Sequence, residues 1–194
     1  MTELVTVSGS HGFRGPLPLV EEVAGESQLD RTGIVFDGDV QEEYPAREEA
    51  LREAVDDDTV AVAGFSAGAH LALALLQDSP AVFAQDTLVL AFDPPAVLGT
   101  GDGRSRIRPL DSPACEVVLV YPSVRSQGDR IDGDCTAFDI PYGEFTYDEE
   151  DPGEEQYRRM DRAHRFQDRD DTIRSLVRQL LRENVSVQSL PGDA

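Results

Sequence analysis

The chain has 194 residues, of which 17 are basic and 38 acidic, so its formal net charge is −21 at pH 7. A chain of this length buries about 70% of the surface that its unfolded form exposes, which supports one hydrophobic core and not two. The negative charge repels phosphate backbones and anionic lipid headgroups, so nucleic-acid and membrane partners are not expected. We expect a single domain at 1–184 and a flexible tail at 185–194.

The basic residues are all arginines, and Asp outnumbers Glu by 22 to 16. This bias resembles that of proteins from salt-accumulating halophiles, whose cytoplasm screens charge repulsion because the Debye length at molar salt is about 3 Å. We therefore interpret the acidic surface as a halophilic adaptation and not as an acidic binding function.

No stretch approaches the roughly 20 consecutive apolar residues that a membrane span requires, and the first residues lack the pattern of a signal peptide. A cytoplasmic location is the expectation. Two cysteines, Cys115 and Cys135, are too few for a disulfide framework or a thiolate metal site, and we expect both to be buried, reduced thiols.

Short apolar runs alternate with segments of helical pattern, which is typical of a parallel sheet covered by helices. The fold class predicted is α/β, with a doubly wound, mostly parallel sheet of about five to six strands and helices on both faces. Strands are predicted at 4–7, 33–36, 59–63, 87–92 and 116–121, and helices at 17–27, 44–55, 67–78 and 170–184.

Two long segments, 93–114 and 122–153, interrupt this alternation, and both follow predicted strands. Ligands of open α/β sheets bind outside the carboxyl ends of the strands. Loops longer than about 15 residues are usually functional or disordered. We therefore expect these two segments to border a site.

The sequence Gly64-Phe65-Ser66-Ala67-Gly68 stands directly after a predicted strand and directly before an Ala- and Leu-rich helix. A G-x-S-x-G nucleophile elbow requires this context, because a sharp turn exposes the serine hydroxyl above the sheet. Flanking glycines are needed where a side chain would collide with the neighbouring strand and helix. The alternative is a tight turn in which Ser66 only caps the helix.

The chain resembles the α/β-hydrolase superfamily, and Ser66-Ala67-Gly68-Ala69-His70-Leu71-Ala72 is similar to the run in its esterase and formamidase-like branch. A second segment, His11-Gly12-Phe13-Arg14-Gly15, resembles the superfamily's oxyanion loop. The resemblance implies an oxyanion hole at Gly12, Phe13 and Ala67, in which the N–H groups of Phe13 and Ala67 would each contribute about 3–4 kcal/mol.

Ser66 needs a general base, and the chain has three histidines. His11 belongs to the oxyanion loop, and His70 lies one turn into the helix after Ser66, where we expect it to be packed inside. His164 remains, after the last predicted strand and before the closing helix, where the superfamily places its base. The alternative for His164 is a solvent-exposed position on an acidic helix.

The resemblance places the acid after the strand that ends near Tyr121, where Gly128-Asp129-Arg130-Ile131-Asp132 is similar to the superfamily's acid loop. Asp129 is the predicted acid, with Asp132 and Asp134 as alternatives. Asp93 is a further candidate, because some hydrolases carry the acid one strand earlier.

Only about 22 residues separate the fourth and fifth predicted strands, which leaves no room for a helical lid. The pocket should be open or bordered by the aromatic-bearing segment 136–147, and an open pocket suits short or water-soluble acyl substrates. No GxxxxGK[ST] or HExxH motif is present, and neither a cofactor nor a metal is expected.

The sequence therefore predicts a carboxylesterase-like serine hydrolase that cleaves esters, thioesters or small amides through an acyl-enzyme on Ser66. The alternative is a catalytically inactive hydrolase-fold protein that binds a ligand or partner. Acyl transfer to an acceptor other than water is a third possibility. The acyl chain length and the oligomeric state stay open.

The halophilic interpretation makes a first prediction. Because salt screens the repulsion among the excess carboxylates, we expect the melting temperature to rise substantially between dilute buffer and molar KCl. Thermal denaturation followed by circular dichroism measures this shift. An unchanged melting temperature would contradict the interpretation.

Overall fold

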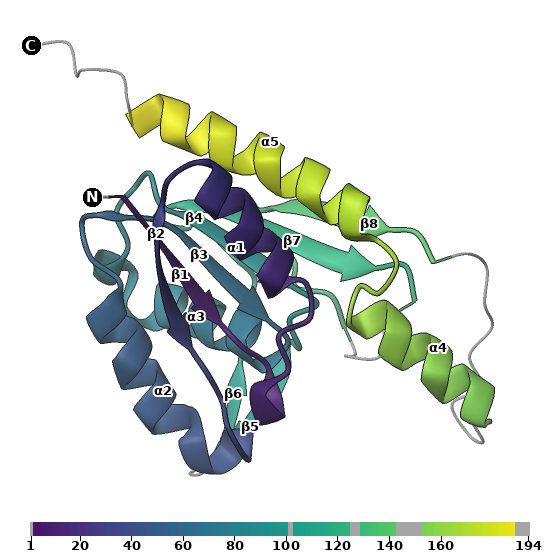
Figure 1. Ribbon diagram of the computed structural model, residues 1–194. Helices are drawn as coiled ribbons and strands as arrows, with labels where there is room; N and C mark the ends of the chain where they lie inside the picture. Colours follow the sequence, from purple (N-terminus) through teal and green to yellow (C-terminus); the bar gives the residue numbers. More distant parts are fainter. Residues whose placement is uncertain (1, 101–102, 125–128, 143–152, 189–194) are drawn as a thin grey trace, which may run out of the picture.

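Six parallel strands form the centre of the molecule, in the spatial order β2-β1-β3-β4-β7-β8 (Figure 1). The computed structural model describes residues 2–100, 103–124, 129–142 and 153–188. The strands of the sheet are β1 (Glu3–Val7), β2 (Asp30–Ile34), β3 (Thr59–Phe65), β4 (Leu88–Phe92), β7 (Glu116–Pro122) and β8 (Thr136–Ile140), and β5 (Val97–Thr100) and β6 (Gly103–Arg106) form a separate antiparallel hairpin.

Helices cover both faces of the sheet. In Figure 1, α1 and α5 lie on one face and α2 and α3 on the other, while α4 lies beyond the carboxyl ends of the strands. The two faces bury two separate apolar clusters. The predicted doubly wound α/β fold is confirmed. The helices are α1 (Leu17–Glu26), α2 (Val40–Ala54), α3 (Ala67–Asp78), α4 (Glu154–His164) and α5 (Asp170–Gln188), with short 3-10 turns at Ser10–Gly12 and Pro80–Val82.

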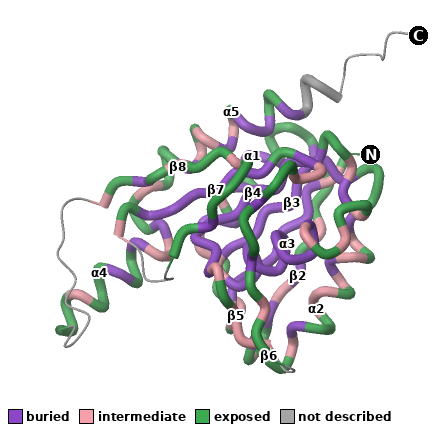
Figure 2. Tube along the Cα trace, turned by 180° about the vertical axis from the view of Figure 1, so that it is seen from behind, coloured by how far each residue is buried: buried purple, intermediate pink, exposed green. Residues whose placement is uncertain are grey.

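The central strands β3 and β4 are buried at every position, as the continuous buried trace in Figure 2 shows. Strands buried on both faces read as unbroken apolar runs, which is why the sequence pattern locates them well. Two polar residues follow these strands directly, Ser66 after β3 and Asp93 after β4. The best-buried part of the sheet therefore positions both side chains.

The edge strands account for most of the differences from the predicted elements. The strand expected at 33–36 is β2, which begins earlier, at Asp30. Most of its residues are exposed, so the apolar pattern of the sequence does not mark where the strand begins. The helix expected at 44–55 begins at Val40, where the Asp39 side chain accepts a hydrogen bond from the Gln41 amide at 2.7 Å and caps the helix. A cap five residues before the start of the predicted helix is easily missed.

The two segments expected as long loops contain regular structure. Segment 93–114 holds the β5–β6 hairpin, and segment 122–153 holds the sixth strand, β8. Helix α4, which precedes the closing helix, was not predicted as an element either. Helix α5 continues to Gln188, so the first part of the tail expected at 185–194 is helical, and 189–194 lies outside the described residues.

Ion pairs join α5 to α1 on the surface of the sheet's first face. Arg174 pairs with Glu22 at 3.1 Å, and Arg178 pairs with Glu26 at 2.7 Å. The hydrogen bond from Arg178 holds the pKa of Glu26 below its ordinary value. The guanidinium groups of these arginines therefore pair with some of the excess carboxylates, and Arg178 does so through two hydrogen bonds to Glu26.

Among the described residues, no helix combines the length and the apolar character that crossing a membrane would require. Cys115 and Cys135 are both free thiols, as expected, although Cys135 is only partly buried. Burial raises the pKa of the Cys115 thiol to about 12, so this cysteine is not a reactive thiolate.

Candidate active site

Ser66 occupies a sharp turn between β3 and α3. Its backbone has φ 52° and ψ −117°, a conformation that non-glycine residues rarely adopt, and its side chain makes no capping hydrogen bond to the helix. A methyl group at Gly64 would lie 2.5 Å from Ala69 Cα, and one at Gly68 would lie 2.2 Å from the Val7 carbonyl oxygen. The two flanking glycines are therefore required by collisions with the helix and the neighbouring strand, as the sequence predicts.

His164 is the last residue of α4, and its ring contacts a carboxylate from the sheet. The imidazole Nδ1 lies 2.6 Å from Oδ2 of Asp93, whose side chain is fully buried. The His164 ring also packs on the Phe65 ring, with centroids 4.9 Å apart. Because an ionised carboxylate only accepts hydrogen bonds, Nδ1 donates, and Nε2 is left with its lone pair.

Asp93 is held by the end of the sheet. It follows β4 directly, with a positive φ of 43°, and its amide donates to the Val120 carbonyl oxygen at 2.8 Å. This bond continues the β4–β7 pairing one residue beyond the strand. The carboxylate that orients His164 is thus the candidate one strand earlier than the predicted acid.

Asp129, the predicted acid, does not contact His164. It lines a different cavity together with Arg106 and Arg130, and that cavity shares none of its described lining residues with the cavity of Ser66. The reason is topological. Because β8 runs parallel to β7, the connection between them must return to the starting edge of the sheet. It carries the alternatives Asp132 and Asp134 to exposed positions next to Leu110.

Ser66 and His164 line one cavity of about 290 Å³ at the carboxyl edge of the sheet. Its walls come from the loop after β1, the start of α2, the β5–β6 hairpin and the end of α4. Of the segment expected to border the pocket, 136–147, the described residues 136–142 do not line the cavity, and 136–140 form β8; residues 143–147 lie outside the described residues. The described lining residues are Gly9, Ser10, Phe13, Val40, Phe65, Ser66, Ala67, Pro95, Leu98, Asp161, His164 and Arg165.

Two of the amides expected in the oxyanion hole are engaged elsewhere. The Gly12 N–H donates to the Phe36 carbonyl oxygen, and the Phe13 N–H donates to the Ser10 carbonyl oxygen at 3.1 Å. This follows from the tight turn at 10–12, in which His11 and Gly12 have positive φ and the chain folds back on itself. Gly12 and Phe13 therefore do not supply free donors, although the Phe13 side chain lines the cavity.

Two other amides in the cavity wall are available. Ala67 is the first residue of α3, so its N–H has no partner within the helix. The Ser10 N–H has no acceptor among the described residues, and Gly9 beside it passes so close that a Cβ there would lie 3.3 Å from the Ser66 Cβ. In the sequence, the sign that points to Ser10 is its position three residues after the end of β1 at Val7.

His70 is fully buried and plays a structural part, as expected. Its Nδ1 lies 2.7 Å from the Pro95 carbonyl oxygen, to which it donates, and its Nε2 lies 2.8 Å from Ser105 Oγ. These bonds tie α3 to the loop after Asp93 and to the β5–β6 hairpin. Burial lowers the pKa of His70, so the ring is neutral at neutral pH.

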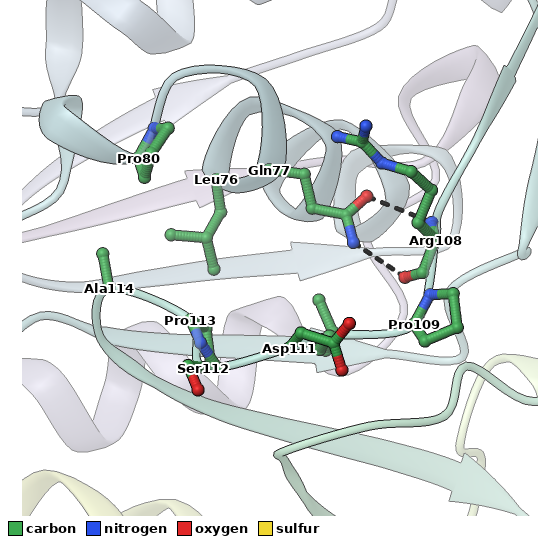
Figure 3. A pocket seen from close by; sticks show the side chains of 10 residues that line it. Leu76, Gln77, Pro80, Arg108, Pro109, Asp111, Ser112, Pro113 and Ala114 are labelled. Carbon is green, nitrogen blue, oxygen red and sulfur yellow. Dashed lines mark hydrogen bonds between the residues drawn. The ribbon is translucent and has the colours of Figure 1, made fainter.

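A second cavity, of about 560 Å³, lies at the other end of α3 (Figure 3). It is lined by Leu76 and Gln77, ten residues after Ser66 and so about 15 Å along the helix. Gln77 holds its rim by bonding both the amide and the carbonyl of Arg108, at 3.1 and 2.7 Å. Among the described residues, no group of three or more His, Cys, Asp or Glu side chains is placed to hold a metal ion.

Comparisons with known proteins identify the fold. No family model matches the chain, and no curated protein matches it either. A solved structure from Xanthomonas campestris pv. campestris, described as a "putative hydrolase of the alpha/beta superfamily", superposes with a TM-score of 0.58. The match covers 94% of this chain and 99% of that chain at 15% sequence identity. The chain has an α/β-hydrolase fold.

The described sheet has six strands, all parallel. The strands that precede Ser10, Ser66 and Asp93 all end at the same edge of this sheet. The fold itself thus explains why these residues meet.

The neutral state of His70 has a measurable effect on stability. Its pKa is lowered by folding, so below about pH 6.5 the unfolded chain binds a proton that the folded chain does not, and the contribution of His70 is lost as pH falls. We expect His70→Gln to lower the free energy of unfolding by roughly 2–3 kcal/mol at pH 7.5. The difference should shrink below pH 6.5, as measured by denaturant titration.

Ser105→Ala is the matched control, because it removes one partner of His70 and keeps the imidazole. It should cost about 1 kcal/mol and retain the acid sensitivity of the native chain. A deficit of His70→Gln that is constant from pH 7.5 to pH 5 would contradict this account.

Proposed function

We propose that the protein is a serine hydrolase that cleaves carboxylic esters, thioesters or small amides through an acyl-enzyme on Ser66. The observation that carries the proposal is the hydrogen bond of 2.6 Å between the buried Asp93 carboxylate and His164, which lines the same cavity as Ser66 in its strained turn. Nucleophile, orienting acid and base follow in the chain order Ser, Asp, His, which is the order of α/β hydrolases.

In the proposed mechanism, the Ser66 hydroxyl oxygen attacks the substrate carbonyl and its proton passes to Nε2 of His164. Asp93 fixes the imidazole through Nδ1 and stabilises the imidazolium that forms. The imidazolium then protonates the leaving group. Water, deprotonated by the same Nε2, attacks the acyl-enzyme and releases the acid, which returns Ser66 and His164 to their starting states.

The amides of Ser10 and Ala67 are the proposed oxyanion donors. Both lie in the wall of the cavity next to Ser66, and neither has an acceptor among the described residues. Donors of this kind stabilise the negative charge on the carbonyl oxygen in the tetrahedral intermediate. The cavity of about 290 Å³ favours a short acyl group or a small leaving group.

The alternative, a hydrolase-fold protein that binds without turnover, would require a missing base or acid. The Asp93–His164 pair argues against it. Burying a carboxylate with an imidazole bonded to it costs free energy of folding, so such a pair is expected where it has a function or where other contacts compensate the cost. Acyl transfer to another acceptor shares the acyl-enzyme, and its products would distinguish it from hydrolysis.

Active-site labelling tests the proposed nucleophile, base and acid. We expect a fluorophosphonate probe in molar KCl to label the native chain and not Ser66→Ala. His164→Ala and Asp93→Asn should lower the labelling rate by roughly 10³-fold or more, because each removes activation of the same hydroxyl. The measurement is the rate of labelling followed by gel fluorescence and mass spectrometry.

Asp129→Asn is the matched control, since it removes a carboxylate that does not contact His164. It should label within about twofold of the native rate. A native chain that is folded and does not label would contradict the proposed function, and loss of labelling in Asp129→Asn with retention in Asp93→Asn would overturn the assignment of the acid.

The proposed role of the Ser10 amide has its own test. Ser10→Pro removes the N–H together with the hydroxyl group, and proline is compatible with this position because Ser10 begins a 3-10 turn and Gly9 before it is extended, with ψ −178°. We expect kcat for a 4-nitrophenyl ester to fall by about 10²- to 10³-fold with a small change in KM. Ser10→Ala keeps the amide and should stay within about threefold, whereas equal losses in both variants would contradict the role of the amide.

A further inference from the structure

We infer that the substrate carries a carboxylate in addition to the scissile bond, and that Arg165 binds it. The inference rests on the proposed function and deepens it. Arg165 directly follows His164 and is the one arginine among the described residues that line the cavity. A cationic group beside the base places an anionic substrate group within the same small cavity as Ser66.

The guanidinium of Arg165 is held in place from two sides. The central carbon of the guanidinium, Cζ, lies 4.2 Å from the centre of the Phe13 ring, which also lines the cavity. Its Nε donates to Oδ1 of Asp161, one helical turn earlier in α4, at 2.8 Å. A stacked and tethered guanidinium loses little further conformational freedom when it binds a ligand.

The two Nη nitrogens of Arg165 have no acceptor among the residues that the structure describes. They carry four N–H groups in one plane, which is the arrangement that binds a carboxylate through two parallel hydrogen bonds. Asp161 uses only the Nε position, so it orients the group without occupying this edge. The side chain of Arg165 is 34% exposed, and the residue lines the cavity of Ser66.

A cationic substrate, bound by Asp161 of the Arg165–Asp161 pair, is the less favoured alternative. Asp161 is 54% exposed and already accepts from Arg165 through Oδ1, so it offers one oxygen in a more hydrated position. The long-range field of a chain with charge −21 repels anions, and binding of a carboxylate must therefore come from short-range contacts of this kind. Bidentate bonds to a preorganised guanidinium meet that requirement.

Arg158, which lies in α4, provides an internal comparison with Arg165, which caps the end of that helix. Arg158 pairs with Glu154, also one turn earlier, but its side chain is 77% exposed and it does not line the cavity. Each arginine therefore pairs with an acidic residue of α4 four positions earlier, and of the two only Arg165 has both an aromatic support and a place in the cavity wall. Arg158→Gln is the matched control for Arg165→Gln.

The test compares esters that differ only in a distal carboxylate, in molar KCl. On the acyl side the pair is mono-4-nitrophenyl adipate and 4-nitrophenyl hexanoate; on the alcohol side it is 4-acetoxybenzoate and 4-methylphenyl acetate. For at least one pair we expect kcat/KM to favour the carboxylate ester by tenfold or more, and the pair that shows the preference identifies the side that faces Arg165. Arg165→Gln should remove this preference through KM and leave the neutral ester within about twofold, and Arg158→Gln should change neither.

Two outcomes overturn the inference while the proposed function stands: native turnover of neutral esters with no preference for either carboxylate, or equal losses for charged and neutral esters in folded Arg165→Gln. The second would make Arg165 a positioning residue for His164.

Calorimetric titration of Ser66→Ala with adipate is independent of turnover. Binding that is lost in the Ser66→Ala, Arg165→Gln double variant supports the carboxylate site even if no ester is hydrolysed, and absence of binding together with absence of preference overturns it.

Discussion

Gly68 passes so close to the end of β1 that a methyl group there would lie 2.2 Å from the Val7 carbonyl oxygen and 2.4 Å from that of Ser8. This approach brings β1, β3 and α3 together at backbone contact distance. The chain must then turn within one residue, and Ser66 takes the strained conformation that lifts its hydroxyl above the sheet. The same contact brings the loop after β1 against Ser66, so the proposed nucleophile and the proposed oxyanion donors are fixed by one packing constraint.

The parallel sheet assembles the rest of the site. Strands β1, β3 and β4 end at one edge, and the residues that follow them face a common cavity. Asp93 extends the pairing of β4 with β7 by one bond and is buried completely, which removes its freedom to move. His164 arrives from α4, outside the sheet, and is held by this carboxylate and by the Phe65 ring. The sheet therefore supplies the rigid groups, and a helix beyond its edge supplies the proposed base.

Charge is distributed unequally between the surface and the interior. The surface carries the carboxylate excess, part of it held by arginine forks between α1 and α5. The interior keeps one buried carboxylate at the site, Asp93, with a specific imidazole partner. Among the described residues, Arg165 is the arginine that lines the cavity of Ser66, where the Phe13 ring supports it. In such an acidic chain, recognition at the site depends on short-range contacts more than on the overall field.

The sequence by itself determined the fold class, the elbow at Ser66 and the central strands, because each is encoded by neighbouring residues: buried strands by unbroken apolar runs and the elbow by glycines at fixed spacing. It also singled out His164, which lies in the cavity of Ser66. Only the tertiary structure decided that Asp93 and not Asp129 contacts His164, because among 38 acidic residues the relevant one is selected by which strand end faces the imidazole. The tertiary structure also showed that the available amide is that of Ser10 and not that of Phe13, because the turn at 10–12 engages the Phe13 N–H in a hydrogen bond. It revealed β8 as well, whose exposed positions at the edge of the sheet hide the apolar pattern of a strand.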